Sequence, residues 1–488
     1  MFYQKAAIVP ENTFASDEVL KKYLNHSLSA EHKIEILAKL ELFGKKCGGE
    51  FLAWSLSAES NPPRLVNYSP WGHRIDHIEM DQGWKHLEAA AAVNGIVAEA
   101  YEKKYGADSR ILQMSLLYLY SPSSAFVSCP LAMTDGAARV LQSQSRQNET
   151  LKQAFLNLTS RDPAQFWTSG QWMTERIGGS DVSMTETIAQ KSDANAKVYK
   201  LSGDKWFTSS TTSQMALTLA RIDNELSLFF VPMRLADGSL NHLTVNRLKD
   251  KLGTKALPTA ELSLRGTEAI LIGEQGLGVK NIAPLLNITR IYNSICALGH
   301  MRRALDLAQD YSQKRIAFGK IISQHDLHKA TLNELENEFK KCFELTFMAV
   351  ELLGKEEAGL ASAEEAKLLR ALTPLVKMYT GKKVLSICSE VIECFGGAGY
   401  IEDTGIPRLL RDAQVFSIWE GTTNVLALDF LRAASKDGAV ELLAAWMESK
   451  KKSEIAKRIK QLPFTEVARI RKNCFQLCEY LIQSRLPS

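Results

Sequence analysis

The sequence lacks the patterns that mark several common classes of protein. No CxxC pair occurs among its eight cysteines, and no group of Cys and His residues has the spacing of a zinc site. We therefore expect reduced thiols in a reducing compartment and no bound metal. The net charge of +4 is small for 488 residues, so overall charge does not indicate a nucleic-acid partner. The hydrophobic share of 45% excludes a mainly disordered chain.

A secretion signal and a continuous membrane-spanning segment are also missing. The N-terminus has no basic start followed by an apolar stretch, and its early acidic residues argue against a transit peptide. Residues 111–134 contain no charged residue, but five serines together with Pro122 and Pro130 interrupt them. We expect a buried helix that ends near Pro122, then a polar turn and a second buried segment. The expected location is cytoplasmic, of bacterial type.

Composition divides the chain into four regions. Residues 1–165 are rich in helix formers, residues 166–280 contain short β-rich segments broken by Gly, Asp-Asn and Pro, and residues 281–435 return to helical spacing. Residues 436–488 form a short, amphipathic and basic helical tail. The pattern predicts a mainly α-helical protein with a central antiparallel β-domain.

Local patterns add three predictions. Trp84–Tyr105 is predicted as a helix that stops at Gly106. Asn61–Asp76, with its Pro, Gly and aromatic residues, is predicted as an ordered connector rather than a helix. A stripe of apolar residues at steps of three and four predicts a core-facing helix in a bundle. The stripe consists of Ile295, Leu298, Met301, Leu305 and Ala308.

The basic tail has two interpretations. Between Lys450 and Lys472 the only acidic residues are Glu454 and Glu466, so basic residues are in excess. A solvated helical face explains this charge, and so does a surface for an anionic partner such as nucleic acid or a coenzyme phosphate.

Two patches whose residues could contact a ligand lie near the start of the β-rich region. In QWMTERIGGSDV, Gly178 and Gly179 would let a ligand approach the backbone, and Thr174 and Ser180 offer hydroxyl groups. By itself the glycine pair is equally a turn, and no GxGxxG fingerprint follows a strand here. In GDKWFTSS, from Gly203 to Ser210, a Trp two residues before a Thr could place an indole against a flat ring.

Two further patches follow in the second helical region. In KRIAFGK, Arg315 and Phe318 stand where a helical pattern meets Gly319, which is equally a helix C-terminus. The stretch from Cys394 to Asn424 contains GGAG and then Glu420 between a Trp and a Gly. A carboxyl group beside apolar bulk suits proton abstraction near neutral pH, although a lone Glu is equally a solvated loop residue.

Together, and in this order, the four patches resemble the acyl-CoA dehydrogenase family. The resemblance covers Trp84–Ala433, and RDA…IWEGTTN after GGxGY is its most specific part. NPPRLVNYSPWGHRID, CPLAMT at Cys129–Thr134 and Asn424 at the end of EGTTN are similar to the AidB-like branch.

The resemblance implies an FAD-binding homotetramer of fatty acid metabolism with an α-helical N-domain, a β-barrel-like middle domain and a four-helix C-domain. FAD would lie between the β-domain and the C-domain of one subunit and contact a neighbouring subunit. The implied cofactor contacts are Met173, Thr174, Gly179, Ser180, Trp206, Thr208, Arg315, Phe318, Gly396, Gly397, Thr422 and Asn424.

The implied reaction is α,β-dehydrogenation of an acyl-CoA, with Glu420 as the base that removes the α-proton and FAD as the hydride acceptor. Some members supply the base just before an Arg on an earlier helix, where this chain has Thr289 ahead of Arg290. The expected electron acceptor is electron-transfer flavoprotein. The alternative is an AidB-like flavoprotein with little or no dehydrogenase activity that binds acyl-CoA or, through the basic tail, DNA.

Three positions depart from the family pattern. Asp326 and Glu393 stand where Gln is usual, and Trp419 is bulkier than the common Tyr. The first two could reshape flavin contacts, and the third could change the width of the acyl pocket. The tail is also shorter than the basic domain of AidB itself, which weakens a DNA role.

Overall fold

The structure is a computed structural model that describes residues 5–144, 148–192, 195–464 and 466–483. It divides into two compact units. The helical unit comprises Met1–Glu50, Lys103–Ser123 and Arg290–Ser488, and the barrel unit comprises Phe51–Glu102 and Ser124–Thr289. Helix α9 (Gly278–Ser312) begins in the barrel unit and ends in the helical unit.

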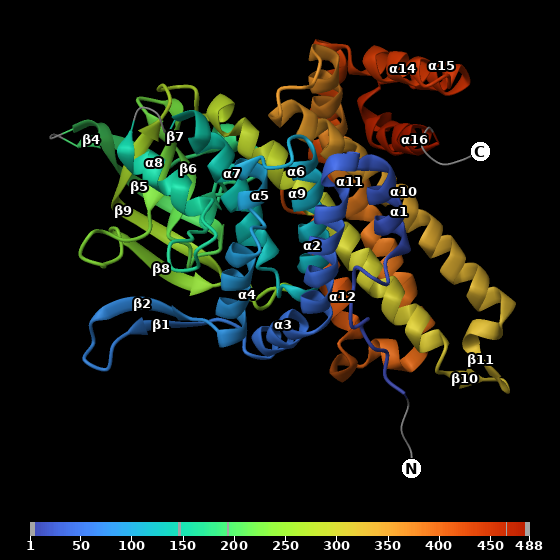
Figure 1. The fold of residues 1–488 in the computed structure, drawn as a ribbon. Helices are drawn as coiled ribbons and strands as arrows, with labels where there is room; N and C mark the ends of the chain where they lie inside the picture. The colour runs from blue at the N-terminus through green and yellow to red at the C-terminus, as the bar shows by residue number, and fades with distance from the viewer. Residues whose placement is uncertain (1–4, 145–147, 193–194, 465, 484–488) are drawn as a thin grey trace. The chain divides into compact units, whose positions relative to one another are not determined.

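The barrel unit is built around a seven-stranded sheet (Figure 1). Its pairings β6–β4–β5–β9–β7 form a path that the β6–β7 pairing closes, so the sheet is a barrel as predicted. Most pairs are antiparallel, whereas β3 and β4 each pair with β6 in parallel. The strands are β3 (Ser169–Trp172), β4 (Ile188–Ser192), β5 (Asn195–Ser209), β6 (Met215–Ile222), β7 (Glu225–Pro232), β8 (Leu243–Leu248) and β9 (Thr259–Ile272).

The surroundings of strand β6 explain why its sequence is an unbroken run of mostly apolar residues. Ala216 and Ala220 pack in one core cluster with residues of β5, β7 and β9. Leu217 and Leu219 point to the opposite face and pack in a second cluster with helices α7, α8 and α9. Because both faces are covered, the strand shows no polar alternation.

Helices α7, α8 and the start of α9 pack against one face of the sheet within this unit. Close packing is visible at Gly136 of α7, where a Cβ would lie 2.6 Å from Cγ of Leu285 in α9. A larger residue at position 136 would therefore separate the two helices. The helices of the unit are α3 (Glu50–Ser60), α4 (Gln82–Val93), α5 (Ala98–Glu102), α7 (Ser128–Gln144) and α8 (Glu149–Leu158).

The connector predicted at Asn61–Asp76 is not helical, as expected, but it contributes to a β-hairpin. Strands β1 (Arg64–Tyr68) and β2 (Arg74–Glu79) pair antiparallel. The carboxylate of Asp76 accepts the backbone N–H of Val245 in β8 at 2.9 Å, which attaches the hairpin to the barrel. The sequence signal was obscured because Pro and Gly flank short strands.

The prediction of one helix over Trp84–Tyr105 is wrong. Helix α4 ends at Val93, and α5 starts at Ala98. Gly95 has a φ of 68°, and the N–H of Ile96 donates to the carbonyl oxygen of Ala91 at 3.0 Å, which is a Schellman motif. The Asn-Gly pair inside the alanine-rich stretch is the stop signal that helix propensity concealed.

The helical unit packs long helices along one another, with α10 beside α11 (Figure 1). The predicted apolar stripe of α9 is buried from Ile295 to Ala308. The predicted break near Pro122 is also confirmed, because α6 ends at Tyr120 and the 3-10 turn η1 (Ser121–Ser123) follows. The helices are α1 (Glu18–Ser27), α2 (Ala30–Gly48), α6 (Asp108–Tyr120), α10 (Asp326–Glu357), α11 (Ala363–Cys394), α12 (Ile406–Ala413), α13 (Thr423–Asp437), α14 (Ala439–Ser449), α15 (Ser453–Lys460) and α16 (Ile470–Ile482).

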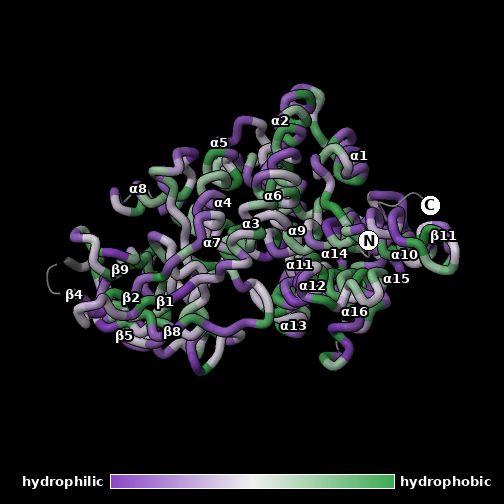
Figure 2. The backbone as a smooth tube through the Cα atoms, turned by 90° about the horizontal axis from the view of Figure 1, so that it is seen from below, coloured by the Kyte–Doolittle hydropathy of each residue, from purple (hydrophilic) through white to green (hydrophobic). Residues whose placement is uncertain are grey.

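The basic tail folds as the helices α14, α15 and α16, along which hydrophobic and hydrophilic residues alternate (Figure 2). Cys474 and Cys478 share the buried face of α16. The Tyr379 hydroxyl of α11 donates to Glu479 at 2.5 Å. The tail is therefore an integral part of the helical unit and cannot be removed without exposing its core.

All eight cysteines are free thiols. Among the described residues, no helix combines the length and the apolar character that crossing a bilayer requires. The described part of the chain also contains no group of three or more His, Cys, Asp or Glu side chains arranged to hold a metal ion.

Candidate functional site

Glu420 lies in a short loop between the 3-10 helix η7 (Gln414–Ser417) and helix α13. The φ of Glu420 is 56°, and that of Gly421 is 104°. A non-glycine residue in this left-handed region is uncommon and persists only where neighbouring contacts hold it. Contacts from neighbouring elements must therefore hold this loop.

Helix α9 holds the loop through two side chains. The amide group of Asn293 donates to the carbonyl oxygen of Phe416 at 3.1 Å, and its oxygen accepts the indole N–H of Trp419. Arg290 Nε donates to the carbonyl oxygen of Glu420 at 3.4 Å. The bulky Trp419 side chain is therefore turned toward α9.

Helix α11 holds the same loop from a second element. Lys377 Nζ donates to the carbonyl oxygen of Gly421 at 2.6 Å. One turn further along α11, a Cβ on Gly381 would lie 2.6 Å from the carbonyl oxygen of Phe416. The helix and the loop can approach this closely because position 381 is a glycine.

An ion pair with Asp429 secures Arg290, and Asp429 also binds Arg370. Asp429 of α13 binds Arg290 Nη1 and Arg370 Nη2, each at 2.6 Å. Burial alone would raise the pKa of Asp429, but the two guanidinium groups outweigh it and hold that pKa below its ordinary value. Asp429 therefore stays ionised and keeps Arg290 in place beside Glu420.

Lys377 is an unusual member of this cluster because its side chain is buried. Burial lowers the pKa of Lys377 to about 7; the negative charge of Glu420 opposes this shift, and the positive charge of Arg290 adds to it. An ammonium group that titrates near neutral pH beside a predicted base is a typical feature of functional sites.

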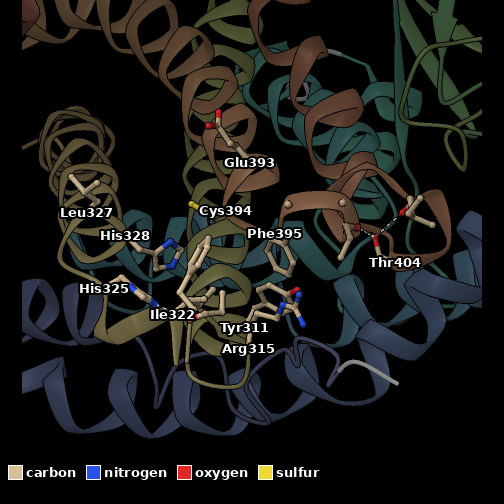
Figure 3. Close-up of a pocket in the computed structure, with 16 residues that line it drawn as sticks. Tyr311, Arg315, Ile322, His325, Leu327, His328, Glu393, Cys394, Phe395 and Thr404 are labelled. Atoms are coloured by element: carbon tan, nitrogen blue, oxygen red, sulfur yellow. Dashed lines mark hydrogen bonds between the residues drawn. The ribbon is translucent and has the colours of Figure 1, made fainter. Parts of the chain in front are cut away.

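Four predicted cofactor contacts meet elsewhere in the helical unit, around a cavity of about 990 Å³ (Figure 3). Arg315, Phe318, Gly396 and Gly397 all line it. The cavity lies where the end of α9, the start of α10 and the end of α11 come together. Residues that are about eighty positions apart in the sequence are thus neighbours here.

The lining of this cavity fits an anionic, hydrogen-bonding group. Arg315 lies beside the stacked rings of Tyr311 and Phe395, whose centroids are 4.5 Å apart (Figure 3). Nε2 of His328 is buried and has no hydrogen-bond partner among the described residues. A Cβ at Gly396 would meet nothing within 4 Å, so the backbone there is open to a ligand. A nucleotide pyrophosphate could use the cation and the open backbone.

The segment Lys314–Lys320 is a small hairpin rather than a helix C-terminus. Helix α9 ends at Ser312, and β10 (Ile316–Ala317) pairs with β11 (Lys320–Ile321). Phe318 and Gly319 form its two-residue turn with φ values of 49° and 77°. Phe318 at the tip is 97% exposed.

The first two patches of predicted cofactor contacts are neighbours in the barrel unit. The backbone N–H of Trp206 in β5 donates to the carbonyl oxygen of Thr174 at 2.9 Å. Lys249 Nζ lies 3.4 Å from the ring centroid of Trp206. The buried hydroxyl of Thr208 donates to the carbonyl oxygen of Ala260 at 2.8 Å, so its oxygen remains as an acceptor.

The loop after Thr174 is compact. Met173 is buried, whereas Gly179 and Ser180 are exposed. A Cβ on Gly179 would lie 2.5 Å from Thr174 Oγ1, so glycine is required for this approach. The loop thus presents an exposed glycine and serine next to the Thr174 side chain.

A buried ion pair that the sequence did not reveal anchors this loop. Lys205 Nζ binds Glu175 Oε1 at 2.7 Å, and both side chains are buried. The same carboxylate accepts the hydroxyl of Thr187 at 2.6 Å and the N–H of Glu186 at 2.6 Å. Thr174 and Trp206, which adjoin the two charged residues, are positioned by this pair.

The remaining predicted residues lie on exposed or helical positions. Thr422 is exposed at the N-cap of α13, and Asn424 is exposed and accepts a hydrogen bond from Arg471 Nη1 at 3.3 Å. The Thr289 hydroxyl donates to the Leu286 carbonyl oxygen of its own helix. Of the departures from the family pattern, Glu393 lines the cavity, and Asp326 is exposed at the start of α10.

Sequence reasoning missed Asn293, Lys377, Gly381 and Asp429. A lysine inside an apolar stretch of a predicted helix was the one available signal, because charged side chains are rarely buried without a partner. The contacts of the other three residues have no local sequence signature.

Models of known families match three successive parts of the chain. Residues 3–162 match the adaptive response protein AidB N-terminal domain, residues 170–267 the acyl-CoA dehydrogenase middle domain and residues 276–435 the acyl-CoA dehydrogenase C-terminal domain. Acyl-CoA dehydrogenase family member 11 of Caenorhabditis elegans is 44% identical over 92% of this chain and 73% of that protein. The chain belongs to the acyl-CoA dehydrogenase family.

The AidB-like branch of this acyl-CoA dehydrogenase family is also confirmed. The putative acyl-CoA dehydrogenase AidB of Escherichia coli is 31% identical over 92% of this chain and 83% of that protein. The crystal structure of Caenorhabditis elegans ACDH-11 in complex with C11-CoA is 40% identical, with a TM-score of 0.93 over 99% of this chain and 88% of that chain. A solved structure named Bd2924 apo-form is 55% identical, with a TM-score of 0.95 over 99% of this chain and 98% of that chain. The predicted fold class is therefore correct.

Proposed function

We propose that the protein is an FAD-dependent acyl-CoA dehydrogenase in which Glu420 removes the α-proton of an acyl-CoA thioester. The observation that carries the proposal is the loop of Glu420, held in a left-handed backbone conformation by Arg290 and Lys377. Such restraint fits a residue whose carboxyl group must meet a reacting carbon atom. The C11-CoA complex of the worm relative supports an acyl-CoA as the substrate.

In the proposed reaction the α-carbon of the thioester loses a proton to the Glu420 carboxylate, and the β-carbon loses a hydride. The product is a trans-2-enoyl thioester and a protonated Glu420. A hydrogen bond to the thioester carbonyl oxygen from the backbone N–H of Glu420 would stabilise the enolate charge that develops as the proton leaves. The restraint of the loop serves this step because both the carboxyl group and the backbone N–H belong to Glu420.

FAD supplies the hydride acceptor when it is bound. We propose that Trp206 packs on its isoalloxazine ring, that Thr208 forms a hydrogen bond near its reactive nitrogen, and that Met173, Thr174, Gly179 and Ser180 contact the ring and the pyrophosphate. The cavity residues Arg315 and Phe318 would reach FAD across a subunit interface, with Gly396 and Gly397 nearby, and Thr422 and Asn424 would hold the adenosine diphosphate part. The arginine and the open backbone of the cavity support the nucleotide contacts.

An anaerobic titration of the purified protein with a panel of acyl-CoAs tests this function, because a substrate would bleach the flavin absorbance. The Glu420→Gln variant should retain flavin and lose the bleaching. Glu441→Gln, an exposed glutamate on α14, is the matched control and should bleach like the wild type. Undiminished turnover in Glu420→Gln would remove Glu420 from its role.

The second candidate is an AidB-like flavoprotein with little dehydrogenase activity that binds DNA. Exposed basic residues on α15 and its flanks favour it, including Lys450, Lys451 and Lys457. Others pair with acidic neighbours, such as Lys460 with Glu448 at 3.1 Å, which favours a solvated face. Since the tail is part of the core, the test is charge reversal of the three lysines rather than deletion. A salt-sensitive duplex shift that the reversal abolishes would support DNA binding.

We also propose that the protein assembles as a homotetramer and passes its electrons to an electron-transfer flavoprotein. Exposed apolar side chains around the cavity support assembly, since Phe318, Leu327 and Tyr400 are each more than 80% exposed. Light scattering of the wild type and of a Phe318→Ser variant tests it. A wild type that is monomeric at all concentrations would exclude assembly.

A further inference from the structure

Lys377 holds the Glu420 loop, but its buried charge has no part in the proposed reaction so far. Its side chain is 1% exposed within α11. An ammonium group has three protons to donate, and the described residues provide one hydrogen bond, to the carbonyl oxygen of Gly421 at 2.6 Å. The residue is therefore unlike the surface lysines of the same helix.

Packing alone does not require a lysine at this position. Taking an ammonium group out of water is costly unless it is paired, and a methionine of similar length would fill the same space without that cost. The charge and its hydrogen bond must therefore have a role that offsets the free-energy cost of burying the ammonium group. Both act on the segment that follows Trp419.

The hydrogen bond fixes the backbone on the C-terminal side of Glu420. Arg290 of α9 holds the carbonyl oxygen of Glu420, and Lys377 of α11 holds that of Gly421. Because a peptide group is planar, fixing a carbonyl oxygen also fixes the N–H of the next residue. The two peptide groups on either side of Gly421 are thus held by cations from two helices, which maintains the left-handed φ of Gly421 directly after Glu420.

The charge acts on the carboxyl group itself. The charged groups that influence Lys377 are Glu420 and Arg290, and Arg290 is paired with Asp429, which also binds Arg370. Since burial brings the pKa of Lys377 to about 7, the ammonium form is present in the range below neutral pH where a carboxyl group titrates. A protonated Lys377 then favours the ionised form of Glu420.

We propose that Lys377 is a positioning residue for Glu420, which fixes the backbone that carries the carboxyl group and stabilises its ionised form. This inference rests on the proposed function, because it assigns Lys377 a part in proton abstraction by Glu420. It predicts two separable effects of replacing Lys377. The position of Glu420 should change, which lowers kcat, and the pH dependence of kcat/KM should shift.

The experiment compares Lys377→Met, Lys377→Gln and the control Lys367→Met, which changes an exposed lysine of the same helix. The pH profile of kcat/KM is measured with an acyl-CoA that reacts with the wild type. Loss of the positive charge makes Glu420 harder to ionise, so the acidic limb of Lys377→Met should move to higher pH by about one unit. Loss of the hydrogen bond should lower kcat on the plateau by about tenfold.

The glutamine variant separates the two effects. Lys377→Gln lacks the charge but keeps an N–H donor, so it should show the same shift of the acidic limb and a smaller loss of kcat. Lys367→Met should match the wild type in both. A Lys377→Met profile whose acidic limb coincides with that of the wild type overturns the electrostatic part, and an undiminished kcat overturns the positioning part.

A measurement without turnover accompanies the kinetics. In wild-type protein labelled with 13C at lysine Cε, one resonance should titrate near neutral pH, and it should be absent from Lys377→Met. If neither Lys377 variant folds, this titration in the wild type remains as the test, and the absence of any such resonance overturns the inference. Failure of the proposed function is distinguishable, because the wild type would then react with no acyl-CoA at all.

Discussion

Replacing Gly381 by alanine should impair catalysis without removing the proposed base. The added Cβ would lie 2.6 Å from the carbonyl oxygen of Phe416, 3.2 Å from its carbonyl carbon and 3.4 Å from the Cα of Ser417. Ordinary contact begins near 3.4 Å, so the backbone oxygen and α11 must separate by about 0.8 Å. A backbone atom cannot swing aside as a flexible side chain would.

The displacement should reach Glu420 because the loop is short and restrained on both sides. Asn293 holds Phe416 and Trp419, and Arg290 holds Glu420. Moving Phe416 therefore either breaks the contact with Asn293 or shifts the segment that leads to Glu420. Misplacement of a reacting group by about 1 Å costs on the order of 100-fold in rate. Over-packing should also lower the free energy of unfolding by about 1–3 kcal/mol.

The assay is kcat for an active acyl-CoA, with flavin content and thermal unfolding measured on the same preparations. The control is Gly354→Ala in α10, where a Cβ would collide with the carbonyl oxygen of Ala107, away from the Glu420 loop. Both variants should be destabilised, and Gly381→Ala alone should lose kcat by one to two orders of magnitude. If the two variants keep equal activity at equal flavin content, the restraint of the loop does not matter for the reaction.

Two further predictions concern the cofactor contacts. Arg315→Ala should weaken FAD binding about tenfold or more, because a charged hydrogen bond contributes about 1.5–3 kcal/mol. Titration of the apoprotein with FAD measures this affinity. An unchanged affinity would show that the cavity does not bind FAD. Glu175→Gln should lower the free energy of unfolding by about 3–5 kcal/mol, since Lys205 would remain buried without its partner, as chemical denaturation would show. Burial raises the pKa of Glu175, but Lys205 and Thr187 outweigh it and hold that pKa below its ordinary value. The stabilisation by Glu175 is therefore complete above about pH 4.3 and is lost as the pH falls through the lower folded value, and the variant should lack this part of the acid dependence.

Local spacing determined much of the architecture. The steps of three and four in α9 predicted a buried stripe because a helix returns to the same face at that interval. The β-rich segments predicted a β-domain, and the four patches together indicated the family, whose resemblance implied the barrel. Each of these signals lies within a few turns of one element, where the sequence and the geometry are directly related.

Helix propensity gave a wrong prediction where a two-residue stop signal lies inside a longer run of helix formers. The Asn-Gly pair at positions 94 and 95 ends a helix inside a run of helix formers, because glycine adopts the left-handed φ that closes a Schellman motif. The hairpin at Arg64–Glu79 was missed because Pro and Gly residues flank its two short strands.

The tertiary structure alone decided what surrounds Glu420. The sequence identified the carboxyl group as the candidate base, but Asn293, Lys377 and Gly381 reach its loop from helices that begin far away in the chain. The same is true of the pairing between Glu175 and Lys205. A residue type and its neighbours in sequence specify which chemistry is available, whereas the contacts that orient and charge it depend on which distant helix faces pack together, and no local pattern encodes that.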